Sequence, residues 1–474
     1  MKWKLAAVLL LFSSLSGAET LNLEQYLAKV KQKHRQFIAI AQDLESASYL
    51  SELAYQDLAP TLTLKGSYLD DKKPMSYGLT ILEHNQTTEY TLGVAKKFST
   101  GTFLSVTAMT NESQLELAAA PEKKVGTAGL SIAVSQSLWK DGFGSNTRMK
   151  FEQARINQRA ATESLNVQVQ GLLVQAENVF WDYLYQDQEL KSKQANLDRA
   201  KKIEQWVRNR VSNGIDDRSD LLNAQGLVAA RDLELITAAD DLLSARKQII
   251  NVLELEDGDS FPELQGQLER IRQPSDFIQG VAGRIVKLDT YLSVLDARNK
   301  KLSAEQAVDG QKPDLILEGR YGTNAIEDSM GSATSKISNN DIPTTLVSLK
   351  LIWMLDGSVK NAVTSAAKAT SMSSELKMQR SLLESESSWS EYQRKHREFG
   401  KKIEQAAVLS KIQTEKAAQE RDKLSKGRSV TSKVITAEQD AADAELRLSK
   451  LKAEMRKFEA QAKMYVRLPN QELL

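Results

Sequence analysis

Apolar residues recur at alternating steps of three and four over the last part of the chain. After Gly427, no step is missed from Val434 to Tyr465, as in a helix that packs along one seam against a neighbouring helix. The same series runs earlier, from Gly214 to Val252, with one charged interruption at Arg231. A pattern of this length that occurs twice predicts a tandem duplication. The later seam consists of Val434, Ala437, Ala441, Ala444, Leu448, Leu451, Met455, Phe458, Ala462 and Tyr465.

A second repeated pattern alternates apolar and polar residues, as a strand with one apolar face does. Its form is Pro-x-Leu-x-Leu-x-Gly-x-Tyr, starting at Pro60 in one copy and at Pro313 in the other. A helical pattern precedes each proline, which ends the helix because proline has no backbone N–H to donate. Each repeat is therefore predicted as a helix, strands, a long helix, a turn and a final helix.

These patterns divide the chain into parts. The first repeat is expected to open with one helix from Leu23 to about Leu58, and the second with a helix that Pro274 caps and that runs to about Val308. The predicted parts are a signal peptide (1–18), a first repeat (19–255), a connector (256–274) and a second repeat (275–468).

Strand patterns are more numerous in the first repeat than in the second, which predicts one additional β-hairpin there. The strands have about the length, nine to eleven residues, that an outer-membrane β-barrel uses. A short joint at 99–101 predicts a tight turn, whereas the polar joints 70–87, 111–124 and 323–343 predict long loops on the other side. The predicted strands are 61–69, 88–98, 101–110, 125–138, 314–322 and 344–355.

Two proline-free stretches follow the strands, from Asn146 to Gly214 and from Ser358 to Gly427. A helix of about 65 residues would be about 100 Å long, which is far more than a globular domain needs. Trp139 and Trp353 stand at the strand-to-helix junctions, each followed closely by Asp-Gly. Because each tryptophan directly follows a strand with one apolar face, an anchor at the membrane edge is favoured over ordinary core packing.

Composition excludes several kinds of site. The 63 basic and 62 acidic residues balance, so there is no electrostatic reason to expect nucleic acid. The chain has no cysteine, which excludes disulfides, thiolate metal sites and a lipid-bearing N-terminal cysteine. His34, His84 and His396 lie far apart without ligand spacing, so no metal and no cofactor are expected. No set of residues suited to catalysis is found, and the chain is not expected to be an enzyme.

Export is predicted from residues 1–18, which have the three parts of a secretory signal. Lys2 and Lys4 precede an apolar run, and small residues precede Glu19. No later segment offers the roughly 18 consecutive apolar residues that a spanning helix needs. Such a chain is either soluble outside the cytoplasm or inserted in a membrane as a β-barrel.

The order of these features, repeated twice behind a signal peptide, resembles the TolC family of outer-membrane efflux proteins over nearly the whole mature chain. The resemblance implies a mainly helical, internally duplicated fold in a homotrimer, with an outer-membrane β-barrel above a long periplasmic α-barrel. It implies a passive exit duct for an efflux pump or a type I secretion system. The implied partners are outer-membrane lipid, a periplasmic adaptor protein and an inner-membrane transporter.

The same resemblance implies that the turns at Gly214 and Gly427 form the periplasmic tip, where the tube closes at rest. Family members often carry aspartates shortly after these glycines. Asp220 fits that pattern, whereas Lys433 and Thr436 in the second copy do not, so a purely acidic gate is not expected. The candidate tip residues are Gly214, Asp217, Asp220, Gly427, Lys433 and Thr436.

Opposite charges at equivalent positions suggest a different closure. Asp220 and Lys433 could pair across neighbouring helices, and three such exposed pairs, each contributing about 0–1 kcal/mol, would form a soft lock. The alternative is that both charges are solvated and never meet. The residues also leave open whether the additional hairpin enters a trimeric barrel of 18 strands or folds outside a barrel of 12.

Two other functions stay open at this point. A periplasmic coiled-coil structural or adaptor protein would explain the helical seams and the export, but not the duplicated strands. A secreted enzyme on a helical scaffold would need a catalytic constellation that the sequence does not supply.

Overall fold

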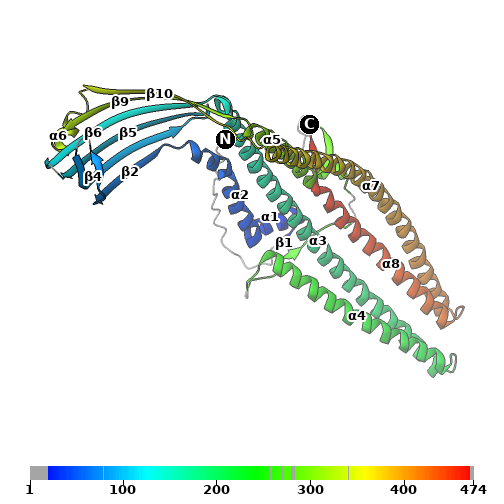
Figure 1. Ribbon diagram of the computed structural model, residues 1–474. Coiled ribbons are helices and arrows are strands. Elements are labelled where there is room, and N and C mark those ends of the chain that lie inside the picture. Colours follow the sequence, from blue (N-terminus) through cyan, green and yellow to red (C-terminus); the bar gives the residue numbers. More distant parts are fainter. Residues whose placement is uncertain are drawn as a thin grey trace. The chain divides into compact units, whose positions relative to one another are not determined.

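The computed structural model describes residues 20–77, 80–118, 120–256, 259–268, 272–278, 283–339 and 341–469. The predicted signal peptide lies outside these ranges. Two compact units are formed (Figure 1). Among the described residues, the helical unit comprises those of 20–43, 164–291 and 382–469, and the sheet unit comprises those of 44–163 and 292–381.

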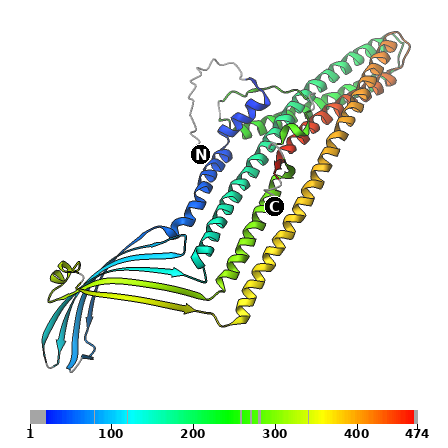
Figure 2. The ribbon, with the colours of Figure 1, turned by 90° about the horizontal axis from the view of Figure 1, so that it is seen from above.

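The sheet unit is built on one antiparallel sheet with the strand order β10-β9-β6-β5-β4-β2 (Figure 2). The additional hairpin of the first repeat is β4–β5, and it lies inside the sheet between β2 and β6. The hairpin therefore belongs to the sheet of the single chain, and a trimeric barrel of 18 strands stays a prediction. The strands are β2 (Thr61–Asp71), β3 (Met75–Tyr77, beside β4), β4 (Thr80–Lys97), β5 (Thr102–Leu117), β6 (Ala120–Ser137), β9 (Asp314–Glu327) and β10 (Ile342–Ile352).

The register gives this sheet one apolar and one polar face, because directly paired residues point to the same side. Leu62 pairs with Val94, Val94 with Val106, and Val106 with Ile132. Their side chains are 39–65% exposed, so this apolar face is bare in the single chain. The next row, on the polar face, is Thr63, Gly93, Thr107 and Ser131.

The prediction of long loops at 70–87 and 111–124 is wrong, because most of these residues are paired strand. Residues 111–115 of β5 pair with residues 123–127 of β6, and Lys124 forms an ion pair of 2.6 Å with Glu112. Here both faces carry polar side chains, so the chain remains extended while the apolar alternation that marks a strand disappears. The predicted loop 323–343 likewise contains the end of β9 and the short helix α6 (Met330–Ser335).

The helices follow the predicted order, with two corrections. The first predicted helix is divided, because His34 has an extended backbone (ψ 119°). The helix predicted from Pro274 begins only at Leu288: Pro274–Phe277 is a single 3-10 turn, and β8 (Arg284–Lys287) pairs with β11 (Tyr465–Leu468) instead. The helices are α1 (Leu23–Lys33), α2 (Arg35–Leu53), α3 (Ser145–Ser212), α4 (Arg218–Leu253), α5 (Leu288–Gly310), α7 (Gly357–Ser425) and α8 (Thr431–Ala460).

The main core of the helical unit joins α1, α3 and α4 around aromatic side chains. Tyr26 and Phe180 are fully buried with their rings 5.2 Å apart, and Trp181 packs edge-on against Phe180. Ile249 and Leu253 close this core from the end of α4. None of the described helices combines the length and the apolar character needed to cross a bilayer.

Candidate functional site

The two predicted tip turns share one backbone design. Gly214 and Gly427 end α3 and α7 with φ values of 70° and 72°, a left-handed conformation that glycine adopts without steric cost. After Gly214, the Ile215 N–H donates to Arg210 O at 2.9 Å; after Gly427, the Arg428 N–H donates to Lys423 O at 2.7 Å. With the glycine N–H bonds three residues back, this is the Schellman ending of a helix.

Side chains from both hairpins pack together just above these turns. Ala224, the second seam residue after the first turn, and Val434, the first seam residue after the second turn, are fully buried. The repeated seams therefore join the two hairpins to each other as well as closing each one. The buried residues of this cluster are Ala200, Ile203, Val207, Ala224, Leu227, Leu424 and Val434.

The first turn is closed by a contact that the sequence reasoning missed. Arg210 donates two hydrogen bonds to Asp216, at 2.8 and 2.7 Å, and its guanidinium lies 4.6 Å from the Trp206 ring. The bond to Asp216 raises the pKa of Arg210. The sequence pattern that could have revealed this contact is a basic residue, Arg210, four positions before Gly214 and an acidic residue, Asp216, two positions after it. Asp217 takes the N-cap position of α4 without a side-chain capping bond.

The charges proposed for a lock lie beside partners of their own hairpins. The charge of Asp220 attracts Arg210 and helps to raise the pKa of that guanidinium. The pKa of Glu420 is lowered mainly by the hydrogen bond that Glu420 accepts from Lys423, and the charge of Lys433 adds to this lowering. Within the ranges that the structure describes, no ion pair joins Asp220 to Lys433. The Thr436 hydroxyl donates back along α8 to Ser432 O at 3.1 Å. The lock between Asp220 and Lys433 stays a prediction.

The two strand-to-helix junctions share an aspartate that holds the start of the long helix. Asp356 accepts hydrogen bonds from the backbone N–H and the hydroxyl of Ser358, at 2.9 and 2.6 Å, and these lower its pKa. In the first repeat Asp141 accepts both bonds from Thr147, at 2.9 and 2.7 Å. Trp139 and Trp353 are 52% and 54% exposed. Neither tryptophan is buried within the single chain, and the anchor at the membrane edge stays a prediction for both.

A close backbone approach seats the additional hairpin on the first junction. A Cβ atom at Gly144, where φ is 77°, would lie 1.9 Å from Ser99 O in the β4–β5 turn. A Cβ atom at Gly101, where φ is 73°, would lie 2.9 Å from Gly144 N. The hairpin turn and the start of α3 can touch only because both positions lack a side chain.

The helical unit also holds a buried cluster of charges that local sequence patterns could not reveal. Glu177 on α3 and Glu459 on α8 are fully buried. Arg272, at the end of the connector, donates to Glu177 at 2.9 Å through its guanidinium and to Glu459 at 2.8 Å through its backbone N–H. Arg456 donates to Glu459 at 2.7 Å, and Lys463 pairs with Glu177. The cluster fixes the connector against helices of both repeats.

The chain is similar to known proteins at the level of family and fold. Residues 26–253 match the sequence model of the family described as "Outer membrane efflux protein". The match covers slightly less than half of the chain, which is therefore similar to this family over its first repeat. The resemblance seen in the repeats is confirmed, and with it an outer-membrane efflux protein that extends into the periplasm. Proteins of this family are channels rather than enzymes.

Solved structures with this fold cover nearly the whole chain. The outer-membrane channel OprN matches with a TM-score of 0.64 and 16% identity, over 93% of this chain and 89% of that one. The outer membrane protein VceC from Vibrio cholerae gives 0.63 and 12%, covering 93% and 94%. The CmeC outer membrane channel from Campylobacter jejuni gives 0.64 and 10%, covering 93% and 85%. No curated protein matches the chain by sequence.

Proposed function

We propose that this efflux protein works as a homotrimer, in which three sheets close into one outer-membrane β-barrel. The observation that carries the proposal is the sheet itself. Its edge strands β2 and β10 have no further partner in the described part of the chain, and open sheet edges do not occur in lipid. Pairing β2 of one protomer with β10 of the next would satisfy both edges.

The apolar face supports the same assembly. Leu64 and Val347 are 75% and 74% exposed in the single chain, and exposed apolar surface of this extent indicates an interaction site. In such an assembly the apolar face of the sheet would contact lipid, and the polar face would contact water. Six strands from each of three chains give a barrel of 18, and barrels of about 16–18 strands enclose an aqueous channel.

The long helices supply the rest of the proposed conduit. α3 has 68 residues and α7 has 69, so each would be about 100 Å long at 1.5 Å per residue. Helices of this length from three protomers would form a periplasmic tube that ends at the turns of Gly214 and Gly427. A periplasmic adaptor and an inner-membrane transporter would dock at that end and supply the energy, while the channel conducts passively.

One experiment separates this function from that of a soluble periplasmic coiled-coil protein. The full chain is expressed in a Gram-negative host, and the outer-membrane and periplasmic fractions are compared. We expect a detergent-dependent trimer in the outer membrane that forms conducting pores in planar bilayers. A monomer that stays in the periplasmic fraction without detergent, and that forms no pores, would refute the proposal.

A further inference from the structure

The apolar face of the sheet carries one built-on element, the short helix α6. Paired residues place Thr110, Ala128 and Ala325 in one row of that face, and Ala333 of α6 packs on this row with no exposed surface. A Cβ atom at Gly126 would lie 2.1 Å from the Ser329 carbonyl carbon. Small residues therefore allow α6 to lie directly on the strands.

Hydrogen bonds fix α6 at this place. The Met330 N–H donates to Glu112 at 3.0 Å, and the hydroxyls of Thr110 and Thr334 lie 2.9 Å apart. Thr323 donates to the carbonyl oxygen of Ile337 at 2.6 Å. The segment that follows the helix is held above the strands, so a defined space remains between them.

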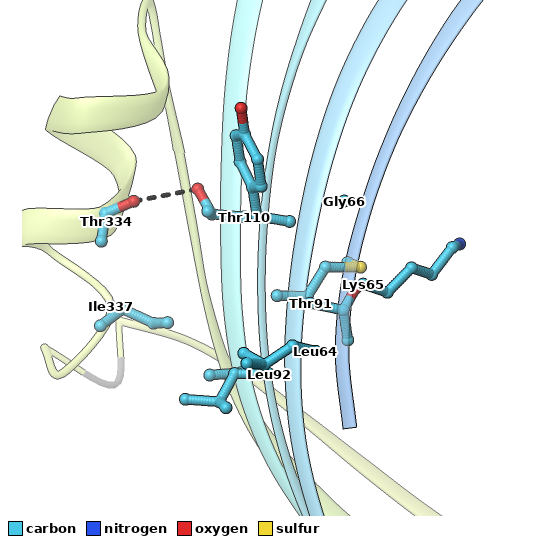
Figure 3. Close-up of a pocket in the computed structure, with 11 residues that line it drawn as sticks. Leu64, Lys65, Gly66, Thr91, Leu92, Thr110, Thr334 and Ile337 are labelled. Carbon is cyan, nitrogen blue, oxygen red and sulfur yellow. Dashed lines mark hydrogen bonds between the residues drawn. The ribbon is translucent and has the colours of Figure 1, made fainter. Parts of the chain in front are cut away.

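That space is a groove of about 430 Å³ beside α6 (Figure 3). Leu64, Leu92 and Ala108 form its floor in one row of the apolar face, and Ile337 forms its opposite wall. Its volume lies within the usual range for ligand pockets, about 300–1,000 Å³.

Most of the surface that lines the groove is apolar, and its polar side chains are those of Tyr90, Thr110, Thr334, Lys65 and Thr91. The two threonine hydroxyls at its end already bond to each other. The Lys65 side chain points away from α6 (Figure 3) and pairs with Glu89 at 3.1 Å. Hydrocarbon is therefore the occupant that gains most, because its burial removes apolar surface from water without leaving a polar group unpaired.

The position of the groove indicates where the hydrocarbon comes from. On one side it is continuous with Leu62 and Val94 of the bare apolar face. On the other side the next row of this face contains Thr88, Glu112 and Glu327, so the face becomes polar there. This boundary lies at the end of the sheet opposite the long helices, which in the proposed assembly is the outer leaflet.

We propose that this groove, between Ile337 and the wall formed by β2, β4 and β5, binds the acyl chain of an outer-leaflet lipid. The inference rests on the proposed membrane orientation of the sheet. Ile337 would cover the upper part of the chain, while the remainder lies along the strands. A lipid held there would link α6 to the wall of the channel.

Photo-crosslinking tests the proposal with the full-length trimer in proteoliposomes. The probe is a phosphatidylcholine with a diazirine in one acyl chain, and cross-linked peptides are identified by mass spectrometry. We expect cross-links at Leu62, which any lipid touching the wall would give, and also at residues 334–337. In Ala108→Phe, whose ring fills the groove, the yield at 334–337 should fall about tenfold, a loss of about 1.4 kcal/mol in binding.

Two variants complete the design. Ala133→Phe makes the same change on the polar face and should leave both yields unaltered. Ile337→Asn changes only the segment outside the sheet and should also lower the yield at 334–337, which covers the case that Ala108→Phe does not assemble.

The outcomes are distinguishable. Cross-links at Leu62 but none at 334–337, or a yield at 334–337 that neither Ala108→Phe nor Ile337→Asn lowers, would overturn the groove proposal and leave the membrane assignment intact. Absence of cross-links at Leu62 would overturn the membrane orientation of the sheet, and the groove proposal with it.

Discussion

At the scale of single residues, backbone conformation decides where the long helices turn. Gly214 and Gly427 adopt left-handed conformations, and a Cβ atom at either position would have no atom within 4 Å. Any cost of a side chain there is therefore conformational rather than steric against neighbours. The same chain contains Gly400 inside α7, also with open space around it and with ordinary helical geometry.

Substitution by alanine should have opposite effects on stability at Gly427 and at Gly400. Gly427→Ala should destabilise the tip by about 1–2 kcal/mol, because alanine in a left-handed conformation clashes with its own backbone. Gly400→Ala should instead stabilise α7 by about 0.5–1 kcal/mol. Hydrogen exchange at residues 420–434 measures the first change, and thermal unfolding of the trimer measures both. Equal effects of the two variants would contradict this assignment.

At the scale of elements, buried charge replaces apolar packing where the connector crosses the helices. Burial by itself raises the pKa of Glu177, but Lys463, Arg272 and Trp181 outweigh it, so the pKa is lowered from its ordinary value of 4.5. A lowered pKa in the folded state contributes stability that is fully present above pH 4.5. That stability is lost as the pH falls through the folded-state pKa.

Removal of this carboxylate should therefore be costly and should change the response to acid. Glu177→Gln leaves three cations with one buried acid, and breaking such a pair costs about 3–5 kcal/mol. We expect a lower melting temperature at pH 7 and a weaker fall in melting temperature below pH 4.5 than in the unmodified protein. Glu391→Gln, which breaks an exposed pair with Arg394, is the control and should leave both measurements unchanged.

At the scale of the whole molecule, the proposed trimer depends on the sheet edges that one chain leaves open. β2 and β10 are the outer strands of the sheet, and the sequence contains no cysteine. Each engineered cysteine pair therefore reports one contact between chains without interference. Neighbouring antiparallel strands bring paired Cα atoms to about 4.5–5.5 Å, which is within the range that a disulfide bridges.

Cross-linking should join the protomers through these strands. Thr63→Cys is combined in turn with Leu346→Cys, Ser348→Cys and Lys350→Cys, all on the polar face. We expect one combination to give covalent trimers under oxidising conditions. Thr63→Cys with Val347→Cys, whose side chains lie on opposite faces, should not cross-link. If every same-face combination remained monomeric on a denaturing gel, pairing of β2 with β10 would be excluded.

Closure of the tip is the other property of the assembled molecule. If Asp220 and Lys433 pair there, Lys433→Glu should raise single-channel conductance, because three attractive contacts become repulsive. The double variant Asp220→Lys with Lys433→Glu restores opposite charges and should return conductance to the original value. Unchanged conductance in Lys433→Glu would remove the lock and favour two solvated charges.

The internal repeat made the helices and strands predictable from the sequence. The contacts between segments that are distant in the sequence could not be predicted. The repeated seams and the proline-free stretches located the long helices and the turns between them, the repeated strand pattern located β2 and β9, and apolar alternation located the other four main strands. The ends of β5 and β6 were not predicted as strand, because polar side chains on both faces leave no alternation of apolar and polar residues in the sequence. The Glu177 cluster also escaped, because its members come from α3, the connector and the C-terminal region, and no local spacing connects them.

The insertion of β4 and β5 as a complete pair has a consequence for how such channels diversify. Two added strands leave every later element running in its original direction, whereas a single added strand would reverse the helices that follow. A lineage could therefore widen the mouth of its pore in increments of six strands per trimer while the tube beneath stays the same. In the proposed trimer, the width of the barrel in the membrane could then change without a change in the width of the helical tube.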